Sequence, residues 1–105
     1  TNKVLAKQIY NGLKSVKNTS NIIVAYEPVW SIGTGIIPKA NDLINSISYI
    51  KSKFRKKTPK VLYGGSVNNK NIAQLKDINI IDGFLIGGAS QSSKKFIDII
   101  KKTFN

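Results

Sequence analysis

Glu27 is the residue best suited to acid–base chemistry, because the 105-residue sequence contains no other Glu, no His and no Cys. It directly follows residues 22–26, an apolar run, β-branched at its start, that is typical of a parallel strand covered on both faces. A loop with Trp30, Gly33 and Gly35 comes next. A carboxylate shielded by a closing loop can take a proton from carbon. The competing interpretation is a strand-end carboxylate that caps a neighbour or pairs with a Lys.

Three glycine-rich segments each follow a short apolar run, and they read GTG at 33–35, GGS at 64–66 and GGAS at 87–90. Strands that alternate with helices form a parallel sheet with right-handed crossovers, so the three segments should meet at one sheet edge. Ligands of such folds bind at this C-terminal edge, where glycines let backbone N–H groups approach an anion. The pattern predicts a phosphate site, although neither GxxxxGK[ST] nor GxGxxG is present.

The elements that position these loops follow from the spacing of apolar residues. Strands are expected over 22–26 and 61–63, and a third within 80–86. Four helices are expected, of which the first covers 4–16. Their inward residues are Leu5, Ile9, Leu13 and Val16, then Leu43, Ile47, Ile50 and Phe54, then Ile72, Ala73 and Leu75, and finally Phe96, Ile97, Ile100 and Phe104. The residues expected to start the later helices are Pro38 in a first turn, Asn68 or Asn69, and Ser92 or Ser93.

The chain is strongly basic, with 17 Lys and Arg against 5 Asp and Glu and a formal net charge of +12. All but Arg55 of the basic residues are Lys, whereas nucleic-acid readers favour the bidentate fork of Arg. The densest run, 51–60, falls at the end of an expected helix, where cations suit the helix dipole. The charge therefore indicates solvated basic surface, and we expect no nucleic-acid partner. A basic nucleic-acid-binding module is the distant third hypothesis.

The missing residue types exclude several kinds of chemistry. Without His or Cys there is no Ser–His–Asp triad, thiol nucleophile, disulfide or His/Cys metal site. No apolar run approaches the roughly 20 residues of a membrane span, and Lys3, Lys7 and Lys14 interrupt any signal-peptide core. Because the sequence does not begin with Met, it is expected to be processed or cut from a longer chain. We expect no metal, no cofactor and no membrane partner.

Residues 25–35, AYEPVWSIGTG, resemble the loop-6 signature of the triosephosphate isomerase family, which usually reads AYEPVWAIGTG. In the same order as in that family, YGGSV at 63–67 resembles its loop 7 and DGFLIGGAS at 82–90 its eighth strand and phosphate loop. The resemblance implies an α/β fold, a partial TIM (β/α)8 barrel with the last three βα units preceded by one helix. Residues 1–105 would be a C-terminal fragment of that barrel domain, roughly 40% of about 250 residues.

The resemblance also implies a function. Glu27 would be the catalytic base that interconverts dihydroxyacetone phosphate and glyceraldehyde 3-phosphate in glycolysis and gluconeogenesis, in the cytoplasm. The phosphate of this small triose substrate would be held by backbone N–H groups, those of Gly33, Ser66, Gly87 and Gly88. Residues 28–38 would be a lid that excludes water from the enediolate.

By the same resemblance, Pro28 and Trp30 belong to the lid, and Tyr63 and Ser66 latch it when it closes. Two features depart from the family pattern. Ser31 stands where Ala is usual, a mild change, and Ile36-Ile37-Pro38 stands where the second hinge commonly has Lys followed by small residues. A Pro in that position stiffens the hinge.

The family's electrophilic His and substrate-facing Lys come from earlier strands, and this sequence has no counterpart of either. Without the electrophile, the enediolate oxygen loses stabilisation that is typically worth several kcal/mol. The leading hypothesis is therefore an isomerase segment that works only with an N-terminal half, within the homodimer usual for the family. The alternative is a non-catalytic remnant with residual phosphate binding. Three parallel strands cannot close a barrel, so the isolated chain is expected to be poorly stable.

Overall fold

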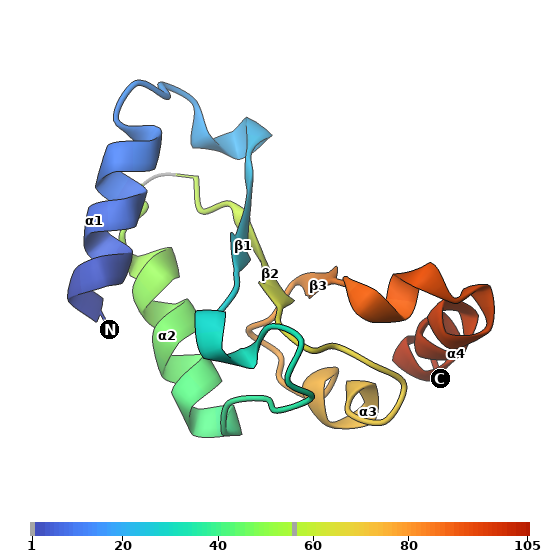
Figure 1. The fold of residues 1–105 in the computed structure, drawn as a ribbon. Coiled ribbons are helices and arrows are strands. Elements are labelled where there is room, and N and C mark those ends of the chain that lie inside the picture. The colour runs from blue at the N-terminus through green and yellow to red at the C-terminus, as the bar shows by residue number, and fades with distance from the viewer. Residues whose placement is uncertain (1, 56) are drawn as a thin grey trace.

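A computed structural model describes residues 2–55 and 57–105, and in this part of the chain helices and strands alternate (Figure 1). The elements in chain order are α1 (Asn2–Leu13), η1 (Thr19–Asn21), β1 (Ile23–Tyr26), η2 (Val29–Ser31), α2 (Ala40–Ser52), β2 (Lys60–Gly64), α3 (Ile72–Leu75), β3 (Gly83–Leu85), η3 (Gly88–Gln91) and α4 (Ser93–Thr103), where η marks a 3₁₀ helix. A first helix followed by three βα units is the order that the hydrophobic periodicity predicted.

The three strands form one parallel sheet in the order β1-β2-β3. Its register places Tyr26 beside Tyr63 and Tyr63 beside Phe84, so one face of the sheet carries a row of aromatic side chains. Because all three strands run the same way, their C-terminal ends and the glycine loops that follow lie at one edge. The predicted α/β class is confirmed.

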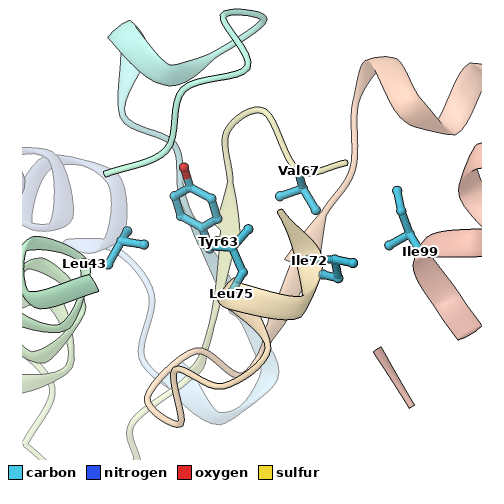
Figure 2. Close-up of a cluster of buried hydrophobic side chains, with 6 residues drawn as sticks. All are labelled: Leu43, Tyr63, Val67, Ile72, Leu75 and Ile99. Carbon is cyan, nitrogen blue, oxygen red and sulfur yellow. The ribbon is translucent and has the colours of Figure 1, made fainter. Parts of the chain in front are cut away.

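The core lies between the helices and this aromatic face of the sheet. The larger cluster of buried side chains, shown in Figure 2, consists of Leu43, Tyr63, Val67, Ile72, Leu75 and Ile99. A smaller cluster joins Ile47 and Ile50 of α2 to Val61 of β2, with Leu5 and Ile9 of α1 packed against it. Helix α2 therefore joins the two clusters through three apolar residues at helical spacing.

The opposite face of the sheet is open. Along β1, the side chain of Ile23 is 67% exposed, while its neighbour Val24 packs against the smaller cluster. The prediction that this strand is covered on both faces is therefore wrong for the described chain. The physical reason is that three strands form an open sheet, whereas a closed barrel would place further strands across from Ile23.

Helix α4 lies beyond β3 and packs against α3 and η3, far from α1 and α2 (Figure 1). Its buried residue is Ile99, with 1% exposure. The residues predicted to point inward are all exposed, namely Phe96, Ile97, Ile100 and Phe104. That prediction is wrong because α4 meets the larger cluster along its Ile99 edge, which leaves the rest of its apolar surface open.

Several predicted boundaries shift by a few residues. Helix α1 ends at Leu13, so Val16 lies beyond it, and Phe54 lies just after α2. Pro38 is buried but precedes α2, which begins at Ala40. Lys56, in the basic run, lies outside the described residues.

The predicted caps differ in their outcome. Ser92 caps α4 as predicted, because its Oγ accepts the Lys95 N–H at 3.3 Å. Asn71 is the residue before α3. Asn68 acts one turn earlier, where its Oδ1 accepts the N–H groups of Lys70 and Asn71.

Asp82 connects the N-terminal ends of β2 and β3 to helix α2. Its Oδ2 accepts the Val61 N–H at 2.8 Å and lies 2.9 Å from the Lys51 Nζ, and its own N–H donates to the Val61 carbonyl at 2.9 Å. Burial alone would raise the pKa of the Asp82 carboxyl, but the Val61 N–H and the Lys51 ammonium outweigh it and lower that pKa.

We expect Asp82→Asn to lower the free energy of unfolding by about 1 kcal/mol at pH 7. The measurement uses a whole barrel in which this chain is joined to an N-terminal segment. Because folding depresses the pKa of Asp82, its contribution is present above the ordinary value of 3.8 and is lost as the pH falls through the folded-state pKa. The difference between variant and wild type should therefore shrink below about pH 4 in urea unfolding curves. Asp77→Asn, at an exposed position, is the matched control and should change little.

Candidate functional site

A cavity of about 670 Å³ opens at the C-terminal edge of the sheet. The loops that follow all three strands contribute to its wall, as the sequence predicted from the three glycine segments. It brings together the predicted base and the predicted phosphate-binding residues, Glu27, Gly33, Ser66, Gly87 and Gly88. Residues separated by 61 positions, from Glu27 to Gly88, thus share one site because the strands are parallel.

Glu27 stands at the end of β1 with its side chain exposed to this cavity. The ion pairs of the described residues are Lys51–Asp82 and Lys102–Asp98, and Glu27 takes part in neither. Of the competing interpretation, capping of a neighbour or pairing with a Lys, the pairing with a Lys therefore finds no support in the described chain.

Gly64, the last residue of β2, leaves room for the Glu27 side chain. A Cβ atom at this position would lie 3.0 Å from the Glu27 Cγ and 3.3 Å from its Oε2. From the sequence, Gly64 was predicted only as part of the GGS anion-binding segment, because the approach of a side chain from the neighbouring strand leaves no local pattern.

The far side of the cavity suits an anion. Around Gly87 and Gly88 there is open space, since a Cβ atom on either would meet no atom within 4 Å. A ligand can therefore approach their backbone closely. Lys70 and Lys95 also line the cavity and add positive charge. Neither Lys was among the site residues predicted from the sequence, although Lys70 follows the predicted GGS loop within four residues.

Residues 28–38 form a loop that is held over the edge of the cavity by Ser66. The Ser66 Oγ accepts the N–H groups of Thr34 at 3.0 Å and Gly35 at 2.9 Å, and it donates to the Ser31 carbonyl. Gly33 and Gly35 have φ angles of 71° and 75°, a left-handed conformation that glycine adopts without strain. Ser66 is thus in direct contact with the middle of the loop that the sequence predicted to be a lid.

Tyr63, Pro28 and Trp30, which were assigned to the lid and latch, fall in two places. Tyr63 lies under the loop, fully buried, and in Figure 2 its hydroxyl points out of the core cluster. Burial raises the pKa of the Tyr63 hydroxyl, and a hydrogen bond with Ser31 partly offsets this. Pro28 and Trp30 line a separate groove of about 550 Å³ that β1 forms with α1, and Glu27 lines both this groove and the cavity. The structure therefore does not bring these two residues into the cavity.

The described residues show neither a metal site nor a membrane span. In residues 2–55 and 57–105, no three acidic side chains converge as metal ligands would. Within the same ranges, no helix has the length and apolar character needed to cross a bilayer.

A parallel α/β sheet whose C-terminal edge carries a carboxylate and three glycine loops around one cavity defines the class, part of a (β/α) barrel. The chain belongs to the triosephosphate isomerase family, whose model matches residues 1–103.

Curated relatives agree with this assignment. The chain is 44% identical to the triosephosphate isomerase of Yarrowia lipolytica over 103 residues, which cover 92% of this chain and 41% of the relative. It is 44% identical to that of Candida albicans over 105 residues, 93% of this chain and 42% of the relative. It is 47% identical to that of Mesomycoplasma hyopneumoniae over 100 residues, 95% and 40%. The chain thus spans about two-fifths of the length of these relatives.

Proposed function

We propose that residues 1–105 form the C-terminal segment of a triosephosphate isomerase barrel. It would interconvert dihydroxyacetone phosphate and glyceraldehyde 3-phosphate as a step of glycolysis and gluconeogenesis, in the cytoplasm. The observation that carries this proposal is the meeting of Glu27 with the three glycine loops at one cavity, in a chain that belongs to the family.

In the proposed mechanism, the Glu27 carboxylate removes a proton from one carbon of the bound triose and returns it to the neighbouring carbon. The intermediate between the two transfers is an enediolate. The backbone N–H groups of Gly33, Ser66, Gly87 and Gly88 would hold the phosphate, and Lys70 and Lys95 would add long-range attraction. The closed loop 28–38 would keep water from the enediolate.

The chain needs a partner segment for this chemistry. It has no His, and an enediolate oxygen requires a donor to stabilise it. We place the N-terminal barrel segment on the open edge of β1, against the groove with α1, whose lining includes Leu5, Ile9, Val24 and Trp30. The complete protein would then form the homodimer expected of the family.

The test compares the 105-residue chain by itself with the same chain fused to the N-terminal three-fifths of the Mesomycoplasma hyopneumoniae relative. We call this fusion the completed barrel. We expect isomerase activity from the completed barrel and none above a Glu27→Gln control from the chain alone, because only the fusion supplies an electrophile. A coupled spectrophotometric assay measures both.

Other results would favour the other hypotheses. An inactive but folded completed barrel that still binds inorganic phosphate would favour a non-catalytic remnant. DNA binding that weakens steeply with salt would favour the basic binding module. Clear activity from the chain alone would contradict the proposed dependence on an N-terminal segment.

A further inference from the structure

The Ser31 hydroxyl is completely buried and joins two parts of the site. Its Oγ donates to the Ile36 carbonyl at 2.8 Å and lies 3.0 Å from the Tyr63 hydroxyl. A serine hydroxyl carries one proton, so with that proton on Ile36 the bond to Tyr63 must have Tyr63 as its donor. A chain of hydrogen bonds therefore runs from β2, through Ser31, to the far end of the loop.

The neighbouring Gly65 leaves the space that this chain of bonds occupies. A Cβ atom on Gly65 would lie 2.8 Å from the Ser31 Oγ and 2.9 Å from the Tyr63 hydroxyl oxygen. Neither group can easily move aside, because both side chains have 0% exposure. Gly65, Ser31 and Tyr63 thus fit together as a unit.

One position at the far end of the loop, Pro38, has no backbone donor. Pro38 has no N–H group, so its backbone cannot donate a hydrogen bond to Tyr63. The Ile36 carbonyl, reached through Ser31, supplies the connection instead. The Ser66 hydroxyl makes a separate connection to the middle of the loop, at Thr34 and Gly35.

We propose that Ser31 is a positioning residue that holds loop 28–38 closed over the cavity by relaying a hydrogen bond from Tyr63 to the Ile36 carbonyl. At this position the family signature usually has Ala, which has no hydroxyl to relay. In this chain the Ser31 hydroxyl therefore makes two hydrogen bonds, one with Ile36 and one with Tyr63, that an Ala could not make. Its importance for catalysis rests on the proposed function, whereas the closure of the loop does not.

The test uses the completed barrel and reads backbone amide hydrogen exchange, which needs no activity. Ser31→Ala should raise exchange at 32–36 about five- to tenfold and leave the strand amides of 61–64 unchanged. Ser48→Ala, at an exposed position on α2, is the matched control and should alter neither region. A general loss of stability would instead raise exchange in both regions.

Should Ser31→Ala not fold, Tyr63→Phe alone tests the same bond from its other partner, and it should also raise exchange at 32–36. In a folded Ser31→Ala background the Tyr63 hydroxyl has already lost the partner it has in this structure, so adding Tyr63→Phe should raise loop exchange no further. The kinetic readout is a fall of about five- to tenfold in kcat/KM for Ser31→Ala, with the shape of the pH–rate profile unchanged.

Unchanged loop exchange in Ser31→Ala, or strictly additive effects of the two substitutions, would overturn the proposal. If the completed barrel is inactive but loop exchange behaves as expected, the hydrogen-bond relay stands and the proposed isomerase function fails.

Discussion

Glu27→Gln in the completed barrel is expected to lower kcat by about 10²–10⁴-fold. Gln keeps the size of the side chain but cannot accept a proton from carbon at neutral pH. KM should change far less, because the loops that carry Gly33, Ser66, Gly87 and Gly88 are intact. Steady-state kinetics in both reaction directions measures the effect.

Two further variants sharpen this prediction. Asp77→Asn removes an exposed acid outside the cavity lining and should leave kcat within about twofold. Gly64→Ala places a methyl group about 3 Å from the Glu27 side chain and should lower kcat by displacing the carboxylate. If Glu27→Gln retains more than a tenth of the wild-type kcat, Glu27 is not the base.

The 105-residue chain by itself is expected to associate and to unfold over a broad temperature range. The outer edges of β1 and β3 have no neighbouring strand in the described chain, and apolar side chains such as Val29, 84% exposed, face solvent. The completed barrel should unfold cooperatively, with a midpoint higher by more than about 10 °C. Sedimentation and thermal circular dichroism measure the two properties.

A pair of substitutions tests whether association of the isolated chain comes from the open face of the sheet or from exposed apolar side chains in general. Ile23→Lys places a charge on the open face of β1 and should prevent assembly of the completed barrel, while reducing association of the isolated chain. Tyr10→Lys, at an exposed position of α1 outside the groove, is the control and should leave assembly unchanged. A monomeric isolated chain with one sharp transition would contradict the prediction.

Local features of the sequence were enough to predict the order of elements. The alternation of apolar runs, glycine segments and helical stripes is set by neighbours only a few residues apart, so helix and strand positions could be predicted to within a few residues. The parallel arrangement follows from that order, and it brought Glu27 and the glycine loops to one edge.

The burial of apolar faces was predicted less well. The exposure of Ile23 on β1 and of Phe96 on α4 depends on which other segments cover them. The hydrophobic pattern shows that an apolar face of a helix or strand must be covered by another segment. It does not show whether that segment belongs to this chain.

The sequence by itself determined the family, the α/β class and the residues able to do chemistry, because each depends on residue type and short spacing. Only the tertiary structure decided that Gly64 makes room for Glu27, and that Gly65 makes room for the hydrogen bonds of Ser31 with Tyr63 and Ile36. The physical reason is that hydrogen bonds and close packing join residues far apart in the sequence, such as Ser31 and Tyr63, which are 32 positions apart. Whether a serine in a loop is a mild substitution or part of a latch depends on what lies across from it once the chain is folded.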